Sequence, residues 1–204
     1  MKGTWMLILL LVAALSLAVT TPQASSNKET SANLPVYTPD GNLKFPTNYR
    51  EWVYLSSGVD MSYSPNAMSM DHSMFDNVFA KPEAYKEFLE TGRWPDKTML
   101  VLEGRKAGTK GSINKNGHFQ TGDVMGLEVH VKDEARFPAG KWAFFNSDDG
   151  VTGKLLPKEM ECYSCHEQHG AVDTTFVQFY PTLLEVAKKK NTLSPAYLKE
   201  ETGK

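Results

Sequence analysis

The chain has 204 residues, an apolar content of 41% and a formal net charge of −2. This length suits one domain with short tails, and the charge lacks the basic footprint of a nucleic-acid-binding protein. It also lacks the acidic signature of a disordered chain, so we expect a soluble globular domain without a nucleic-acid partner.

The first 24 residues have the layout of a secretory signal peptide. Lys2 gives a positive start, an apolar run extends from Trp5 to Val19, and small polar residues follow. A retained membrane anchor is the alternative, but the run is shorter than the roughly 20 residues that span a bilayer. We therefore expect cleavage of residues 1–24 on export, and a flexible lead-in over 25–35.

Turn residues and apolar runs predict the elements between 36 and 102. The helix over 83–91 has the clearest ends, because Pro82 stands at its first turn and Gly92 follows its last. The other elements expected here are a hairpin turn at 39–42, a helix over 49–54, a loop over 57–74, and strands over 76–80 and 98–102.

Residues 125–131 alternate apolar and polar side chains, which predicts a strand with two different faces. The remaining expected elements are a loop or wide hairpin over 104–122, a strand over 141–145, and helix over 157–190 with breaks near Gly170 and Pro181. Together these elements predict an α+β fold, with an antiparallel sheet of four to five strands and flanking helices.

The segment Cys162-Tyr163-Ser164-Cys165-His166 has the spacing of a c-type haem-attachment motif. Residues three apart share one face of a helix, so both thiols can reach the vinyl groups of one porphyrin. The adjacent imidazole of His166 then provides an axial ligand to the iron. The motif therefore predicts one covalently bound haem c on a C-terminal helix.

Three other uses of these cysteines compete with haem attachment. A thioredoxin-like redox pair needs a βαβ context and usually lacks the trailing histidine. A zinc site could recruit Cys162, Cys165, His166 and His169, but all four would lie on one short helix, whereas zinc ligands normally come from two segments. A disulfide between the two cysteines would be strained across so short a span.

No methionine follows His166, so a sixth iron ligand would have to come from earlier in the chain. The predicted loop over 57–74 offers His72 and three methionines, namely Met68, Met70 and Met74. These residues could provide that ligand or a soft copper site, or the methionines could pack on the haem edge.

Glu128 and His130 lie on the polar face of the strand predicted over 125–131. That face is either solvated or turned toward the haem with Glu128 as a proton acceptor. Phe75 and Phe79 share a face of their own strand, where they form ordinary core or an aromatic wall that restricts the open iron position to small diatomic ligands. His118 is expected to be exposed.

Several further blocks occur in the order found in one protein family. They are Asn48-Tyr49-Arg50-Glu51-Trp52-Val53, Pro82-Glu83-Ala84-Tyr85-Lys86, Thr91-Gly92-Arg93-Trp94-Pro95-Asp96, Gly126-Leu127-Glu128, Lys132-Asp133, Trp142-Ala143-Phe144-Phe145, the cysteine motif and Phe179-Tyr180-Pro181. On these blocks the chain resembles the cytochromes P-460 and c′-beta, mono-haem periplasmic proteins of bacteria. The resemblance implies an antiparallel sheet with few helices, a haem domain over 36–190 and a tail over 191–204.

The resembling proteins divide by chemistry. Some cross-link a lysine to the porphyrin and oxidise hydroxylamine, whereas others resemble gas-binding proteins with a five-coordinate iron. Leu102 stands where the cross-linking lysine is expected, and Lys106 follows four residues later. The resemblance thus implies that Leu102 contacts the haem without this bond, that Glu128 is a pocket carboxylate, and that Asp76 or a neighbour replaces a distal arginine.

We therefore predict a periplasmic cytochrome that binds a small diatomic ligand such as nitric oxide, or passes single electrons to a redox partner protein. One alternative is an oxidoreductase acting on hydroxylamine or a related nitrogen compound, with Glu128 as the base. Another is a six-coordinate electron carrier with His72 or a methionine on the iron. The resemblance also implies a homodimer.

Overall fold

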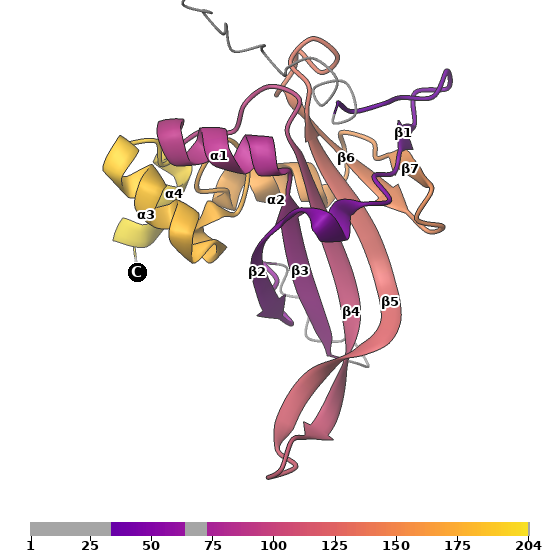
Figure 1. Ribbon diagram of the computed structural model, residues 1–204. Coiled ribbons are helices and arrows are strands. Elements are labelled where there is room, and N and C mark those ends of the chain that lie inside the picture. Colours follow the sequence, from indigo (N-terminus) through magenta and orange to yellow (C-terminus); the bar gives the residue numbers. More distant parts are fainter. Residues whose placement is uncertain (1–33, 64–72, 204) are drawn as a thin grey trace, which may run out of the picture. The chain divides into compact units, whose positions relative to one another are not determined.

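The computed structural model describes residues 34–63 and 73–203, which form one compact unit. Its strands form one antiparallel sheet in the order β1-β7-β6-β5-β4-β3-β2, accompanied by four α-helices (Figure 1). The α+β class is confirmed, but the sheet has seven strands and is larger than the four to five predicted. The predicted signal peptide lies outside the described residues, as do Met68, Met70 and His72.

The strands vary widely in length. They are β1 (Leu43–Lys44), β2 (Val53–Val59), β3 (Met74–Ala80), β4 (Met99–Gly111), β5 (Gly117–Lys132), β6 (Trp142–Ser147) and β7 (Thr152–Leu155). The predicted strands over 76–80, 98–102, 125–131 and 141–145 correspond to β3, β4, β5 and β6. The hairpin turn predicted at 39–42 is confirmed, since Tyr37 bridges Leu43 across it. Strand β1 follows this turn and pairs with β7 at one end of the sheet, and sequence patterning did not predict β7 or this pairing.

The helix predicted over 49–54 is wrong beyond its first turn. Residues Tyr49–Glu51 form a single 3₁₀ turn, η1, and β2 begins two residues later. Val53 pairs with Ala80 on β3, so the edge of the sheet supplies the hydrogen bonds that a helix would have made internally.

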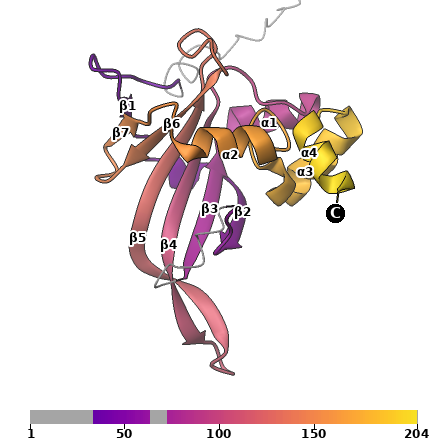
Figure 2. The same cartoon turned by 180° about the vertical axis from the view of Figure 1, so that it is seen from behind.

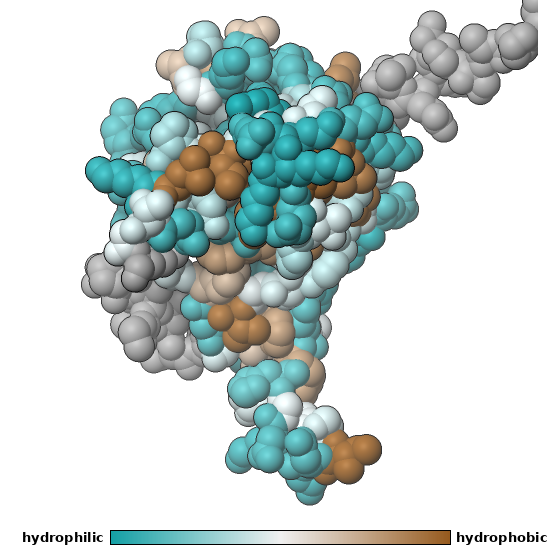
Figure 3. All heavy atoms as spheres, turned by 90° about the vertical axis from the view of Figure 1, so that its left-hand side faces the viewer, coloured by the Kyte–Doolittle hydropathy of each residue, from teal (hydrophilic) through white to brown (hydrophobic). Residues whose placement is uncertain are grey.

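The segment over 104–122 is a hairpin rather than a loop. Strands β4 and β5 continue past the Met74 end of β3 and form a two-stranded arm that projects from the sheet (Figures 1 and 3). The arm buries little: Phe119 is 50% exposed, and Ile113 at its tip is fully exposed. Without core contacts, this segment shows no apolar alternation from which strands could be predicted.

The two faces of the sheet are covered differently. One face packs on the N-terminal segment through a buried cluster that includes Leu43, Trp52, Val101 and Phe145. The other face meets the helices through a second cluster, and Figure 2 shows α2 (Glu161–His169) crossing the strands on this side. The site described below lies on this second face.

The helices end where the sequence predicts for α1, α2 and α3. Helix α1 spans Pro82–Thr91, and Gly92 follows in the left-handed conformation with φ +75°. The predicted breaks near Gly170 and Pro181 separate α2, a 3₁₀ turn η3 (Val177–Phe179) and α3 (Pro181–Lys190). Helix α4 (Pro195–Thr202) lies in the predicted tail, and its Tyr197 is buried in the helical cluster.

No helix within the described ranges has both the length and the apolar character needed to cross a membrane.

Candidate functional site

Alternation along the strands brings four residues singled out in the sequence to one face of the sheet. The side chains on the same face are Asp76 on β3, Leu102 on β4, and Glu128 and His130 on β5, because no bulge interrupts the pairing of β3 with β4 or of β4 with β5 between these positions. Leu102 pairs with Glu128, and His130 pairs with Phe144 on β6. Their side chains therefore project toward the side that α2 covers.

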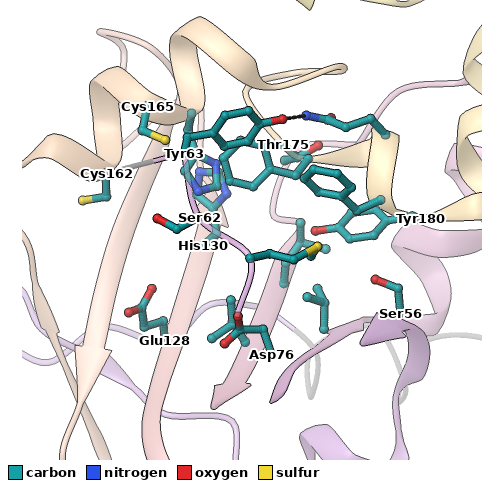
Figure 4. Close-up of a pocket in the computed structure, with 18 of the residues that line it drawn as sticks. Ser56, Ser62, Tyr63, Asp76, Glu128, His130, Cys162, Cys165, Thr175 and Tyr180 are labelled. Atoms are coloured by element: carbon teal, nitrogen blue, oxygen red, sulfur yellow. Dashed lines mark hydrogen bonds between the residues drawn. The ribbon is translucent and has the colours of Figure 1, made fainter. Parts of the chain in front are cut away.

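A cavity of about 870 Å³ lies between this face and α2. Its volume is within the range of about 300–1,000 Å³ that ligand and cofactor sites occupy. Cys162, Cys165 and His166 line it from the helix, and Leu102 and Glu128 line it from the sheet. Figure 4 shows Cys162, Cys165 and Glu128 around this space. The structure thus brings five of the predicted site residues to one cavity.

Tyr163, inside the cysteine motif, attaches α2 to the sheet. Its hydroxyl donates a hydrogen bond to the carbonyl oxygen of Leu156 over 3.1 Å and accepts one from the Phe144 backbone N–H over 3.2 Å. The Tyr163 and Phe144 rings also meet edge to face at 4.8 Å. These contacts fix which face of α2 is turned toward the cavity.

The His166 imidazole is oriented by the backbone. Its Nδ1–H donates to the carbonyl oxygen of Thr174 over 2.8 Å, which leaves the lone pair on Nε2. Burial lowers the pKa of His166 to about 4, although the bond to Thr174 opposes this shift, so the ring is neutral at pH 7. A neutral imidazole with its Nδ1–H held by a carbonyl is the usual form of a metal-binding histidine.

A tight turn presents the Thr174 carbonyl. Asp173 and Thr174 both have positive φ, at 49° and 57°. The Asp173 carboxylate accepts hydrogen bonds from the Trp94 backbone N–H over 3.1 Å and from Arg93 over 3.2 Å. The Trp94 indole N–H donates to the Thr175 hydroxyl over 2.9 Å. The segment around Trp94 therefore supports the orientation of His166 from a distant part of the sequence.

The two cysteines are free thiols and half-buried, and burial raises the pKa of each. They form no disulfide with each other in this structure. In the part of the chain that the structure describes, no group of three or more metal-binding side chains comes together. The His169 Nδ1 contacts Glu200 at 2.9 Å, and its ring stacks on Tyr63 at 4.1 Å.

Phe75 and Phe79 do not line the cavity. They have the opposite parity to Asp76 on β3, so they project to the other face of the sheet, where Phe79 packs against Tyr49 and Tyr54. Their position corresponds to ordinary core packing and not to an aromatic wall of the cavity. The aromatic walls of the cavity include Phe144 and Phe176, whose centroids lie 4.6 and 4.1 Å from that of His166.

The sheet side of the cavity is acidic. Burial raises the pKa of Asp76 to about 6, with smaller contributions from the charges of Glu128 and Asp60. The Glu128 side chain is exposed to the space of the cavity, but the protein around it displaces enough water that desolvation raises its pKa as well. Both carboxyls thus hold a proton at higher pH than a solvated carboxyl does.

His130 is 7% exposed and stacks on the Phe144 ring at 4.0 Å. Its Nε2 has no hydrogen-bond partner among the described residues, although its side chain borders the cavity. Complete burial lowers the pKa of His130 well below the usual value, so this ring is neutral.

Several residues of the site carry no signal in the sequence. Met61, Tyr63 and Gln178 line the cavity, and the Gln178 amide donates hydrogen bonds to the Tyr63 hydroxyl over 3.1 Å and to the His169 carbonyl over 2.7 Å. No spacing or composition marks them, since only the fold brings them near α2. Lys106 does not line the cavity, whereas Leu100 and Leu102 line it from β4.

The cavity fits a haem group in its chemistry. Two free thiols and an imidazole with an available Nε2 border a space of cofactor size with aromatic walls. In the comparison with known families, residues 46–177 match the model of the family described as Cytochrome P460. No curated protein matches the chain. Because the match covers well over half of the sequence, the chain belongs to the cytochrome P460 family, a membership that implies a haem cofactor.

Proposed function

We propose that this protein is an exported c-type cytochrome with one haem, bound covalently through Cys162 and Cys165 and ligated by His166. The observation that carries the proposal is the shared cavity, in which both thiols and the imidazole of one C-x-x-C-H motif border the same space. The hydrogen bond from His166 Nδ1–H to Thr174 supports Nε2 as the atom that binds iron.

Each residue of the motif has a distinct role in this proposal. Cys162 and Cys165 retain the cofactor through thioether bonds, which suits a protein that works outside the cytoplasm. His166 fixes the iron from the α2 side, while Phe144 and Phe176 exclude water from around the imidazole. A bound haem supplies an iron centre that takes small ligands and single electrons.

We further propose that the protein binds a small diatomic ligand such as nitric oxide, or transfers single electrons to a redox partner protein, in the periplasm. Leu102, an apolar residue, borders the cavity, and no described lysine or arginine does. A site with aromatic and acidic side chains and no lysine or arginine among its described residues favours an uncharged ligand over an anionic one. The predicted signal peptide over 1–24 supports export, and the family resemblance supports a homodimer.

Glu128 favours a second function, oxidation of hydroxylamine or a related nitrogen compound. Its raised pKa and its position at the cavity suit a proton acceptor. Leu102, however, offers no amine for a porphyrin cross-link, and Lys106 lies away from the cavity. This enzymatic function is therefore the weaker candidate.

Met61 favours a third function, a six-coordinate electron carrier. It is a described sulfur-containing residue that lines the cavity, and methionine is a common axial ligand in electron-transfer cytochromes. His72, the other ligand considered, lies outside the described residues.

Haem attachment is tested by expressing the chain in cells that contain cytochrome c maturation proteins. The denatured polypeptide should keep the haem colour and gain the mass of one haem. Cys162→Ser and Cys165→Ser should each remove one thioether bond and the double variant both, whereas Ser164→Ala, an exposed position between them, should leave attachment intact. A colourless, unmodified wild-type polypeptide would refute the proposal.

Optical spectra of the matured protein separate the three functions. A ferrous protein that binds carbon monoxide and nitric oxide supports the gas-binding function. A low-spin spectrum that is unchanged by either gas in the wild type but responds in Met61→Ala would identify the six-coordinate carrier. A ferrous Soret band shifted far to the red would reveal a porphyrin cross-link and favour the enzyme.

A further inference from the structure

The cavity carries an unusual balance of charge. Five carboxylates line it, from Asp60, Asp76, Glu128, Glu200 and Glu201. No lysine or arginine of the described residues lines it. An anion that enters this space therefore meets the negative charge of Asp76 and Glu128, and low-dielectric walls strengthen the repulsion.

Asp76 and Glu128 line this cavity from the sheet. Their side chains project from the same face (Figure 4), on β3 and β5 with β4 between them. They are two pairing steps apart, since Asp76 pairs with Gly104 and Glu128 with Leu102. Gly126 pairs with Gly104, and a methyl group added to Gly126 would meet no atom within 4 Å, so there is open space at this position.

Neither carboxyl is neutralised locally. Within residues 34–63 and 73–203, neither Asp76 nor Glu128 has a hydrogen-bond or ion-pair partner. Burial raises the pKa of both groups, and the charge of Glu128 raises the pKa of Asp76 further. Asp76 therefore changes its charge at a higher pH than an ordinary carboxyl, and the raised pKa of Glu128 acts in the same direction.

His130 supplies an independent indication that a polar ligand group belongs here. It follows Glu128 on the same face of β5, is 7% exposed, and borders the same cavity with an Nε2 atom that lacks a described partner. Buried polar atoms are nearly always hydrogen-bonded in folded proteins. An occupant of the cavity is the remaining source of such a partner.

We propose that Asp76 and Glu128 act together as a charge filter that admits neutral and cationic small ligands to the cavity and excludes anions until the pair takes up a proton. This inference rests on the proposed function, because it specifies the class of ligand that a haem in this cavity would meet. Asp76 and Glu128 are the specificity-determining residues, and the neighbouring Val78 and Leu102 are apolar.

Other titratable groups also border the cavity. From the sheet side, Asp60 is exposed, with its carboxylate held by the Met74 backbone N–H over 2.8 Å, and His130 is neutral. From the helical side, the groups that border the cavity are Cys162, Cys165, His166, Tyr180, Tyr197, Glu200 and Glu201. Thioether formation removes the two thiols, and His166 is occupied as the iron ligand.

Fluoride binding to the ferric holoprotein tests the filter, because fluoride stays an anion between pH 5.5 and 8. One carboxylate charge acting at an effective dielectric of about 20 is expected to change anion affinity by roughly tenfold. The wild type should therefore bind fluoride about tenfold more tightly at the acid end of this range. Asp76→Asn and Glu128→Gln should each bind it more tightly at pH 8 and flatten the pH profile.

Two controls distinguish an effect of these two carboxyls from an effect of the protein's net charge and from loss of the haem. Asp123→Asn makes the same charge change on the exposed arm, away from the cavity, and should leave the fluoride profile of the wild type unchanged. Carbon monoxide is uncharged, so its binding to the ferrous protein should not change in any of these variants.

The outcomes distinguish this inference from the proposed function. A fluoride affinity that is independent of pH in the wild type overturns the charge filter, even if no variant folds. So does an unchanged profile in both Asp76→Asn and Glu128→Gln. A wild-type protein without attached haem overturns the proposed function and the filter with it, whereas normal haem and carbon monoxide binding with flat fluoride profiles overturns the filter alone.

Discussion

Replacing Asp173 tests how the protein orients its proposed iron ligand. In Asp173→Ala, the buried side of the turn loses the acceptor for the Trp94 backbone N–H. An unsatisfied buried N–H costs about 1–3 kcal/mol, and an alanine at φ 49° adds about 1 kcal/mol. The exposed Arg93 pair contributes little, because its guanidinium is 56% exposed. We therefore expect Asp173→Ala to lower the free energy of unfolding by about 2–4 kcal/mol.

Asp173→Asn is the matched variant. Asparagine tolerates a left-handed backbone and keeps an oxygen that can accept the Trp94 N–H, so the expected loss is about 1 kcal/mol. Urea unfolding of the two holoproteins, followed by circular dichroism, measures both values. The same variants should shift the iron–histidine vibration in resonance Raman spectra, because the Thr174 carbonyl holds His166 Nδ1–H.

Two results would contradict this account of the turn. An Asp173→Ala protein within about 0.5 kcal/mol of the wild type would mean that the Trp94 hydrogen bond is not needed to hold the turn. A destabilised protein with an unchanged iron–histidine vibration would mean that the turn stabilises the fold without orienting the ligand.

Three further substitutions test other contacts. Tyr163→Phe removes the acceptor of the Phe144 N–H and should lower the free energy of urea unfolding by about 1–2 kcal/mol; no loss would show that α2 is held by ring packing alone. Lys81 is 4% exposed, its Nζ has no described partner, and burial lowers its pKa to about 8. The unfolded chain therefore binds more protons than the folded one between about pH 8 and 10.5, so the free energy of unfolding should rise with pH in that window. Lys81→Met should remove this rise and stabilise the protein at pH 7 by about 1–3 kcal/mol. An unchanged unfolding midpoint in this variant would contradict the prediction. Gly92→Ala places a methyl group 2.8 Å from Lys190 Cβ at φ +75° and should cost about 2 kcal/mol in thermal unfolding, whereas a wild-type melting temperature would contradict the predicted strain.

Elements whose signals are local could be predicted from the sequence. Helix α1 has a proline at its start and a glycine after its end, and the structure places both as expected. The motif from Cys162 to His166 is local as well, and it lies on one helix beside one cavity. Strand β2 could not be predicted, because its hydrogen bonds come from pairing with β3 and its own side chains show no clear alternation.

Strand register decides which residues of the sheet line the cavity, and no sequence motif marks them. Adjacent residues of a strand face opposite sides of the sheet. The prediction that Phe75 and Phe79 contact the haem therefore placed the cavity on the opposite face of β3. Asp76 and Val78, between them, are the β3 residues that line it. Trp94 could not be connected with the turn at Asp173 from the sequence, since its hydrogen bonds to Asp173 and Thr175 cross about 80 positions of the chain.

The arm formed by β4 and β5 offers a place where the chain can be lengthened. Its ladder loses regular register between Gly104 and Ala107, beyond the paired residues that border the cavity. Exposed hairpin tips accept inserted sequence far better than packed strands do. A fluorescent protein or an affinity domain spliced between Ser112 and Asn116 would thus be carried at a distance from the cofactor chamber, with both strands still continuous through the sheet.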